Sequence, residues 1–392
     1  MSIRRRRWTT RTGFEKTAWV VDYVDAAGTR RLKTFERKKE ADAFAATAKV
    51  ELREGVHVAD SASATVQVAG ELWVAGAEKA GLERTTTDQY RQHLQGHIAP
   101  FIGKMKLSAL TVATVRSFED ELRDAGRSAA MIRKILVSLG SLLGDAQERA
   151  LVARNVVRDM RGRRRGKERR QERRQKRKLK VGVDIPTREE IKAIVGALQG
   201  RWRPILLRAI FAGLRASELR GLRWCDVDFE RHEISVHQRA DRFNQIGRPK
   251  SEAGERTVPA PPLIINTLRE WKLRCPKGDL DLVFPNGSGN VEQLNNIVRR
   301  GLMPVQVTVG VVAVRSAESR RPKYTGIHAL RHFYASWLIN RPQDGGLGLP
   351  PKVVQERLGH SSIVMTMDVY GHLFPRGDDA DELAAAERSL LA

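Results

Sequence analysis

Five polar side chains in the second half of the chain have the types and order expected of a phosphoryl-transfer site. Two are arginines, two are histidines and one is a tyrosine: Arg215, His328, Arg331, His360 and Tyr370. The planar guanidinium of arginine donates paired hydrogen bonds to phosphate oxygens and keeps its charge. A phenol, with a pKa of about 10, needs acid–base help or nearby cations to attack phosphorus at neutral pH. Together these residues predict attack on a phosphate by the tyrosine.

Each of these residues also has an ordinary structural explanation. Arg215 lies three positions before Glu218, so the pair predicts a helix-surface ion pair in which the carboxylate holds the guanidinium. His328 and Arg331 are three positions apart on a predicted helix and share one face, whereas His332 is expected to point elsewhere. For the tyrosine, the ordinary explanation is a half-buried aromatic. The catalytic interpretation is favoured because the motifs occur together.

The sequence around these residues predicts a large C-terminal domain over 183–392, mainly helical with a small antiparallel sheet. Thr187 to Glu190 has the pattern of a capping box ahead of an apolar helix. Gly359 is expected to place His360 at a turn, and 305–314 to form an added strand or hairpin. Further helices are expected over 203–212, 291–300, 328–340 and 351–358, and strands over 232–237 and 256–260 flanking a polar hairpin.

The N-terminal part of the chain predicts two smaller units. Residues 1–55 have strand character over 18–25 and 29–35, followed by helical spacing of apolar residues over 36–53. A few strands backed by a helix can place a basic sheet in a DNA groove. The alternative is that these residues form a solvated terminus without a DNA-binding role. Residues 56–157 have the pattern of a helical domain. Its helices are expected over 65–80, 86–95, 111–125 and 128–149.

The charge of the chain indicates a polyanionic partner. The 392 residues carry a formal net charge of +24 at pH 7. Between Arg158 and Lys180, fourteen Lys and Arg stand against three Asp and Glu, which accounts for +11 of that charge. Residues 158–182 are therefore predicted to be a basic linker that follows DNA phosphates. DNA contacts are predicted for Arg4, Arg5, Arg6, Arg7, Arg30, Arg31, Lys33, Arg163, Arg164, Arg165, Arg169 and Arg170.

Other features argue against several classes of protein. Cys225 and Cys275 have the pattern of ordinary reduced thiols. The sequence holds no carboxylate or Cys/His cluster suited to a metal and no Walker-type loop, so no metal, ATP or other cofactor is expected. The most apolar stretch, 307–314, is far too short to cross a bilayer. We expect a cytoplasmic protein, associated with the nucleoid in a bacterial host.

Three segments together resemble the tyrosine recombinase (phage integrase) family. AGLRASELRGLRW over 212–224 is similar to the first arginine box of that family. HALRH over 328–332 is similar to its H-x-L-R-H box, and LGHSSIVMTMDVYGHLF over 358–374 to the box that ends in the nucleophile. The resemblance implies a chain that is mainly α with small antiparallel sheets (α+β). It also implies a helical core-binding, SAM-like domain over 56–157 and an arm-type DNA-binding domain over 1–55.

The resemblance assigns a role to each residue of the boxes. Arg215 and Arg331 would bind the non-bridging oxygens of the scissile phosphate. His328 and His360 would assist proton handling and phosphate binding. Tyr370 would form a 3′-phosphotyrosyl link with DNA.

A lysine on a β-hairpin completes the catalytic set of this family as the acid toward the 5′-oxygen leaving group. The segment RPKSEAGERTVPAP over 248–261 resembles that hairpin, which makes Lys250 the candidate. Without the resemblance, Lys250 would be taken for a solvated lysine.

The resemblance implies a site-specific recombinase that integrates or excises mobile DNA. Its expected partners are double-stranded DNA attachment sites, three further copies of itself in a tetramer on DNA, and a directionality factor or host DNA-bending protein. The C-terminal tail over 381–392 would dock on a neighbouring copy, unless it frays in solution. Two alternatives stay open: a DNA-relaxing enzyme similar to type IB topoisomerases, and a DNA-binding regulator that has lost catalysis.

Overall fold

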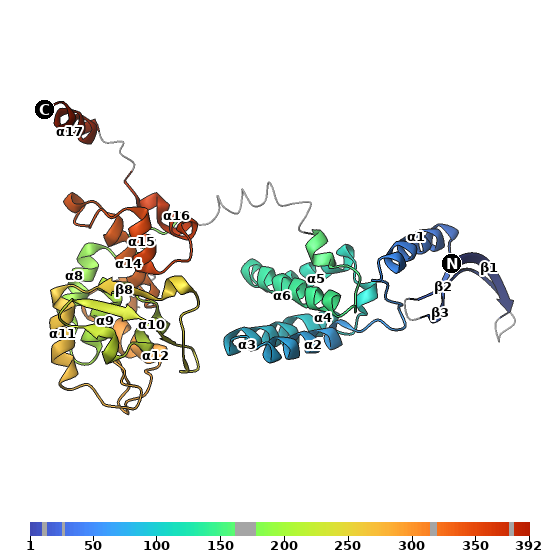
Figure 1. The fold of residues 1–392 in the computed structure, drawn as a ribbon, viewed down its shortest axis with the longest axis horizontal. Coiled ribbons are helices and arrows are strands. Elements are labelled where there is room, and N and C mark those ends of the chain that lie inside the picture. Colours follow the sequence, from blue (N-terminus) through green and yellow to red (C-terminus); the bar gives the residue numbers. More distant parts are fainter. Residues whose placement is uncertain (10–13, 26–27, 161–177, 314–319, 376–379) are drawn as a thin grey trace. The chain divides into compact units, whose positions relative to one another are not determined.

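The computed structural model describes residues 1–9, 14–25, 28–160, 178–313, 320–375 and 380–392. The chain separates into two compact units, Met1–Gln175 and Lys176–Ala392 (Figure 1). Most of the expected linker, 161–177, lies outside the described residues, and so do the five arginines predicted there to contact DNA: Arg163, Arg164, Arg165, Arg169 and Arg170.

The first unit opens with a three-stranded antiparallel sheet backed by one helix. Its strand order is β1-β2-β3, and alternate residues of the sheet pack on the helix around Val21, Tyr23, Ala41 and Ala45. The arginine-rich strand was not predicted, because a run of arginines lacks the apolar alternation that marks a half-buried strand. The elements are β1 (Ser2–Thr9), β2 (Glu15–Val24), β3 (Arg30–Phe35) and α1 (Lys38–Arg53).

A helical domain follows, as predicted, and three of its helices begin at side-chain caps. The hydroxyls of Thr65, Thr111 and Ser128 accept hydrogen bonds from the first-turn backbone of α2, α5 and α6. The prediction that the second of these helices ends at residue 95 was wrong: the chain passes through a π-helical turn over Leu94–Ile98 and continues as a helix to Ile102. The elements are α2 (Val66–Lys79), α3 (Arg84–His93), the π-helix Leu94–Ile98, α4 (Ala99–Ile102), α5 (Val112–Asp124) and α6 (Ala129–Glu148).

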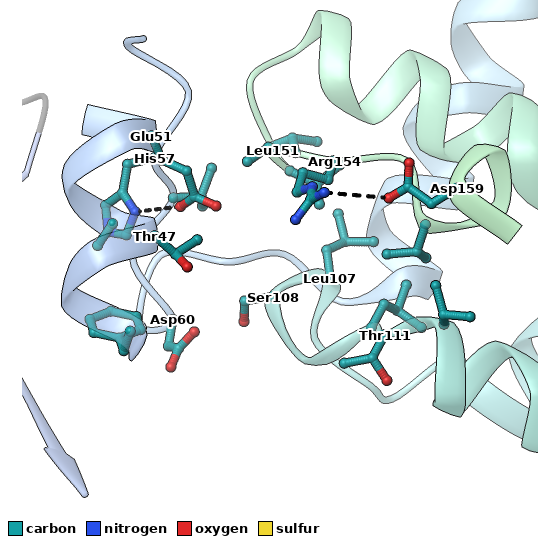
Figure 2. Close-up of a pocket in the computed structure, with 18 of the residues that line it drawn as sticks. Thr47, Glu51, His57, Asp60, Leu107, Ser108, Thr111, Leu151, Arg154 and Asp159 are labelled. Carbon is teal, nitrogen blue, oxygen red and sulfur yellow. Dashed lines mark hydrogen bonds and ion pairs between the residues drawn. The ribbon is translucent and has the colours of Figure 1, made fainter. Parts of the chain in front are cut away.

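A cavity of about 770 Å³ lies in this first unit, between α1 and the helical domain (Figure 2). Thr47, Glu51 and His57 line one side of it, and Leu107 and Arg154 line the other. All of its lining residues belong to the first unit, so it is separate from the candidate catalytic residues of the second.

The second unit is mainly helical with small antiparallel sheets, as predicted. Its described residues form three of them: one has the order β4-β5-β8, one pairs β6 with β7, and one pairs β9 with β10. Its helices are α8 (Arg188–Ala197), α9 (Trp202–Ala212), α10 (Ala216–Gly221), α11 (Pro262–Lys272), α12 (Leu294–Asn296), the π-helix Ile297–Leu302, α13 (Met303–Thr308), α14 (His328–Ile339), α15 (Pro351–Leu358), α16 (Ile363–Tyr370) and α17 (Ala380–Leu391). Its strands are β4 (Val227–Asp228), β5 (Glu233–Val236), β6 (Arg239–Ala240), β7 (Ile246–Gly247), β8 (Arg256–Pro259), β9 (Val312–Ala313) and β10 (Arg321–Pro322).

Two local predictions for this unit were wrong. Residues 305–308 are helical, because they belong to α13, which continues α12 and the π-helix. Of the described residues of this segment, 305–313, only the two of β9 form a strand, and they pair with β10. The segment 248–255 is not one arm of a hairpin with β8, because β8 pairs with β5. It is a loop with a short 3₁₀ turn, Glu252–Gly254, that connects β7 to β8.

Helix α9 lies at the centre of the second unit and packs against α14. It ends at Gly213, whose φ of +57° is left-handed, and this turn brings the chain directly to Arg215. A side chain at Gly213 would also meet the buried ring of Tyr334 on α14, since a Cβ there would lie 2.2 Å from the ring. The glycine therefore serves both the turn and the close approach of the two helices.

Replacing Gly213 with alanine tests this close packing. We expect Gly213→Ala to lower the free energy of unfolding by about 3 kcal/mol or more, since overpacking adds to the cost of left-handed backbone. Gly200→Ala is the matched control, because Gly200 has a φ of +58° but open space around it. It should cost about 1 kcal/mol. Equal losses in equilibrium urea unfolding would contradict the packing argument.

Candidate active site

Arg331 is the more deeply buried of the two candidate active-site arginines. It lies on the inward face of α14 with 3% of its surface exposed. One Nη donates to the carbonyl oxygen of Gly213 and the other to that of Leu358, at 2.5 Å for Leu358. Both carbonyls belong to helix C-termini, where carbonyl oxygens lack intrahelical partners and the helix dipole favours a cation. Burial is the main cause, and the positive charge of Arg215 the second, of a lowered pKa of about 10 for Arg331. Arg331 therefore remains charged at neutral pH.

Arg215 lies beside it at the start of α10. Its Nη1 donates to the Glu218 carboxylate at 2.6 Å, and its Nη2 donates to the carbonyl of Gly359 at 2.6 Å. The predicted Arg215–Glu218 pair is therefore present, and it is strengthened by a hydrogen bond from the Arg215 backbone to the same carboxylate. Gly359 has a left-handed φ of +65°, which turns its carbonyl toward Arg215 and sends the chain on to His360.

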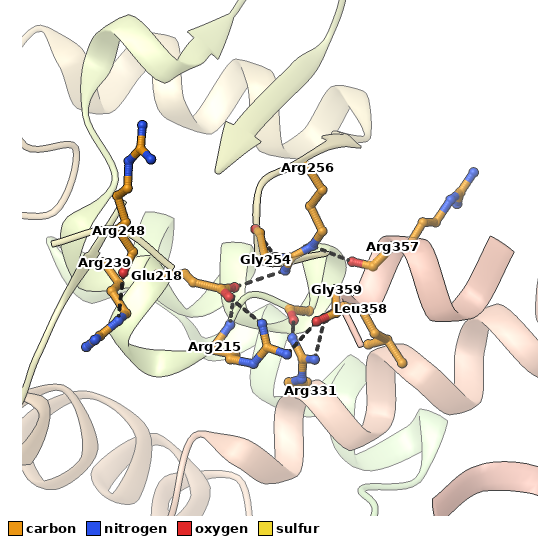
Figure 3. Close-up of polar contacts among 11 residues, drawn as sticks. Arg215, Glu218, Arg239, Arg248, Gly254, Arg256, Arg331, Arg357, Leu358 and Gly359 are labelled. Atoms are coloured by element: carbon orange, nitrogen blue, oxygen red, sulfur yellow. Dashed lines mark hydrogen bonds and ion pairs between the residues drawn. The ribbon is translucent and has the colours of Figure 1, made fainter. Parts of the chain in front are cut away.

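Arg256 completes this network (Figure 3) and was missed in the sequence analysis. Its guanidinium donates to Glu218 at 2.9 Å and to the carbonyls of Gly254 and Arg357 at 3.0 Å and 2.9 Å. It thereby ties the loop before β8 to the first arginine box and to the end of α15. Burial raises the pKa of Glu218, but Arg256 and Arg215 outweigh that effect and hold the pKa at about 2. The RTVP sequence of β8 predicts a strand, and nothing in it indicates that Arg256 bridges distant segments.

Tyr370 and His360 lie near Arg331. Tyr370, the last residue of α16, is 2% exposed, and burial raises the pKa of its phenol to about 12. The ring of His360 is parallel to the Tyr370 ring, with their centroids 6.3 Å apart. Its Nδ1 lies 2.9 Å from the hydroxyl of Thr366. The structure thus brings together the five residues of the boxes, Arg215, His328, Arg331, His360 and Tyr370.

The prediction that His332 points elsewhere was wrong. Its Nδ1 lies 2.7 Å from the hydroxyl oxygen of Tyr370, and its ring meets the His328 ring edge-on at a centroid distance of 4.6 Å. The error arose because helical spacing relates residues of one helix only. The α16 helix approaches α14 in the folded chain from the side on which His332 lies, and no periodicity within α14 can reveal that.

The three imidazoles of the site are neutral at neutral pH. Burial is the main cause that lowers the pKa of His360 to about 4, and the positive charges of Arg331 and Arg215 lower it further. The pKa of His332 is also lowered to about 4, mainly by burial and further by the neighbouring His328 and Arg331. The imidazole of His328 has exposed surface, and partial desolvation with Arg331 and Arg215 lowers its pKa as well. The arginines therefore supply the positive charge of the site.

Lys250 lies at the edge of this arrangement. It is exposed on the loop between β7 and β8, next to Pro249, which packs against Gly254. Because Gly254 accepts a hydrogen bond from Arg256, the loop is connected to the network of the two boxes. The described geometry gives Lys250 a position on the surface rather than within the buried cluster.

The N-terminal residues predicted to bind DNA lie on both faces of the sheet. Residues paired across antiparallel strands share a face. Arg4 pairs with Val20 and Arg6 with Ala18, on the face away from α1, and Arg30 joins this face through an ion pair with Asp22. Arg5 and Arg7 alternate to the α1 side. Arg31 and Lys33 on that side form ion pairs with Asp25 and Asp60, so only part of the predicted set lies on one surface.

Two further properties of the described residues bear on function. Within the described ranges, no group of three or more His, Cys, Asp or Glu residues is placed to hold a metal ion. None of the helices in the described part of the chain combines the length and apolar character needed to cross a bilayer.

Comparison with known proteins identifies the same regions. The phage integrase family matches residues 186–376, and the N-terminal SAM-like domain of phage integrases matches residues 71–123. A tyrosine recombinase XerC-like protein of Caldanaerobacter subterraneus is 27% identical over 366 residues, covering 86% of this chain and 87% of that protein. The ICEBs1 integrase of Bacillus subtilis is 23% identical over 296 residues, covering 71% of each chain.

Solved structures share the fold. The Tn1549 transposon integrase bound to transposon right-end DNA has a TM-score of 0.60 and 20% identity, covering 84% of this chain and 100% of that one. A lambda integrase dimer bound to a core site has a TM-score of 0.55 and 17% identity, covering 95% of each chain.

The buried imidazoles predict a stability that depends on pH. A histidine whose pKa falls from about 6.5 in the unfolded chain to about 4 in the fold stabilises the protein fully above pH 6.5. That stability is lost as the pH falls toward 4. We expect the free energy of unfolding to drop by about 1–2 kcal/mol for each of His332 and His360 between pH 7.5 and pH 5.

Equilibrium urea unfolding of the whole chain at several pH values measures this loss. The variant carrying both His332→Asn and His360→Asn should show a much flatter profile over the same range. Glu218 does not contribute there, because its carboxyl titrates at lower pH in both states. An unchanged slope in the double variant would mean that other groups bind the protons.

Proposed function

This chain belongs to the phage integrase family of tyrosine recombinases, and we propose that it cuts and rejoins DNA strands through Tyr370. Its activity is site-specific recombination, of the kind that integrates or excises mobile DNA. The observation that carries the proposal is the cluster around the Tyr370 hydroxyl. His332 contacts the hydroxyl of this buried phenol and the ring of His360 lies parallel to its ring, while Arg331 and its neighbour Arg215 supply positive charge nearby.

Arg215 and Arg331 bind the scissile phosphate in this proposal. A guanidinium has five N–H donors, and the protein occupies only some of those on each arginine. The rest can bond the non-bridging oxygens and stabilise the negative charge that develops there during attack. Because carbonyls and Glu218 hold both guanidiniums in place before DNA binds, little reorganisation is needed.

The reaction itself is an exchange of phosphate esters. Tyr370 Oη forms a bond to phosphorus while the bond to the 5′-oxygen breaks, giving a 3′-phosphotyrosyl link and a 5′-hydroxyl end. His328 and His360 assist in phosphate binding and proton handling. Lys250, carried on its exposed loop, protonates the 5′-oxygen once the loop is drawn toward bound DNA.

The assembly follows from the number of strands cut. Exchange between two duplexes requires four strand cleavages, and each copy of the chain supplies one Tyr370. We therefore propose a tetramer on paired attachment sites, consistent with a similar structure, a lambda integrase tetramer bound to a Holliday junction. The leucines of α17 are exposed, and in the assembly this helix docks on a neighbouring copy. A directionality factor or host DNA-bending protein selects between integration and excision.

The N-terminal unit and the linker supply DNA contacts beyond the catalytic site. Arg4 and Arg6 lie on the open face of the three-stranded sheet, where they can enter a groove. The fourteen basic residues of 158–180 contact DNA phosphates between the sites bound by the N-terminal and C-terminal units.

A suicide substrate carrying the cognate site tests the proposed nucleophile. We expect the wild type to become covalently attached to DNA, and Tyr370→Phe to form no adduct because the attacking oxygen is gone. Tyr90→Phe, which removes the same atom from the helical domain, is the control and should react normally. Adduct formation is measured as a protein–DNA band that resists denaturation.

The alternatives give other outcomes in the same assay. A regulator would shift the DNA without an adduct in either protein. A topoisomerase-like enzyme would relax supercoiled DNA that carries no attachment site as efficiently as DNA that does.

Neutralising the basic linker tests its contact with DNA. Changing Arg163, Arg164, Arg165, Arg169 and Arg170 to Gln should weaken binding and reduce the slope of log K against log salt by up to about 0.9 for each lost phosphate contact. Binding is measured over a series of salt concentrations. A slope equal to that of the wild type would mean that these arginines do not meet phosphates.

A further inference from the structure

The hydroxyl of Tyr370 lies at hydrogen-bond distance from His332, the last residue of the HALRH segment, which has no role in the catalytic set that the resemblance implies. The distance of 2.7 Å between His332 Nδ1 and Tyr370 Oη is that of a strong hydrogen bond. Tyr370 lies at the end of α16 and His332 on the second turn of α14, so the bond joins these two helices. The phenol is 2% exposed, which leaves little room for water to replace His332.

The other two imidazoles are placed for different tasks. The ring of His360 is parallel to the Tyr370 ring with their centroids 6.3 Å apart, and its Nδ1 lies at hydrogen-bond distance from the Thr366 hydroxyl. The centroid of the His328 ring is 4.6 Å from that of the His332 ring, and His328 is exposed, so a bound phosphate can reach it. Of the three, His332 makes the contact with the reacting oxygen.

We infer that His332 accepts the proton of Tyr370 as this tyrosine attacks the scissile phosphate. The inference rests on the proposed function of Tyr370 and deepens it. His332 touches the attacking oxygen and is therefore itself a catalytic residue.

The charges around His332 explain why transfer waits for DNA. His328 and Arg331 on α14 disfavour a positive imidazole, Asp184 before α8 favours it, and Tyr370 on α16 supplies the proton. Without DNA the phenol keeps its proton, since its pKa is raised to about 12 while the pKa of His332 is lowered to about 4. A phosphate bound to the arginines adds negative charge beside these groups, which makes an imidazolium less costly.

The step balances within the named groups. The Tyr370 O–H proton moves to Nδ1 of His332 while Oη forms its bond to phosphorus. The bond to the 5′-oxygen breaks, and that oxygen takes a proton from Lys250. Rejoining runs the same transfers in reverse: the 5′-hydroxyl attacks, its proton returns to Lys250, and His332 returns its proton to the departing phenol.

The test is the single-turnover cleavage rate of a suicide substrate, measured against pH for the full chain. His332→Asn keeps a hydrogen-bond acceptor near the position of Nδ1 but is not basic, and His332→Ala keeps neither. Both variants should cleave about 100-fold more slowly at pH 7, within the range of general-base catalysis. Their rates should rise about tenfold per pH unit as hydroxide ionises the phenol, while the wild-type rate levels off.

Three controls make the outcomes distinct. His237→Asn, at an exposed histidine of the same unit, should cleave as the wild type does. Affinity for the DNA site should be unchanged in His332→Asn, which excludes a loss of fold. The Tyr370→Phe variant should form no adduct.

The inference is overturned if either His332 variant cleaves at the wild-type rate at pH 7. It is also overturned if His332→Asn is fully active and only His332→Ala is slow, because positioning alone would then explain the contact. The proposed function would still hold in both cases. It fails separately if Tyr370→Phe forms the adduct, because the nucleophile would then be another residue.

Discussion

The buried guanidinium of Arg331 is held by the ends of two helices, and the other residues of the site are arranged around it. Arg331 lies in the interior between the C-termini of α9 and α15 and donates to the carbonyls of Gly213 and Leu358. Removing such a charge from water is costly, and these hydrogen bonds offset part of that cost. Both helices therefore have to end where they do, and each ends at a glycine with left-handed backbone that turns the chain away from the arginine.

The turns that satisfy Arg331 also place its neighbours. The chain leaves α9 at Gly213 and reaches Arg215 two residues later, and it leaves α15 at Gly359 and reaches His360 directly. Glu218 and Arg256 then connect the two turns to the loop that carries Lys250. Three segments distant in the sequence thus share one hydrogen-bonded network, so a shift at one of them displaces the others.

The same cluster of cations explains the resting chemistry of the site. Burial and the neighbouring arginines keep the imidazoles neutral, and burial keeps the phenol of Tyr370 protonated. A site with this balance is unreactive until an anion arrives between the arginines. In the proposed function that anion is the DNA phosphate, so the substrate supplies the charge that makes proton transfer from the phenol favourable.

The sequence by itself determined the reaction class, the helical domain and most element boundaries, because capping residues, left-handed glycines and apolar periodicity act locally. Thr187 with Glu190 capped α8 as predicted, and Arg215 with Glu218 formed the expected pair. Only the tertiary structure decided the place of His332, the bridging role of Arg256 and the pairing of β8 with β5. These depend on which helix or strand packs against which, and contacts between distant segments leave no periodic trace in either segment alone.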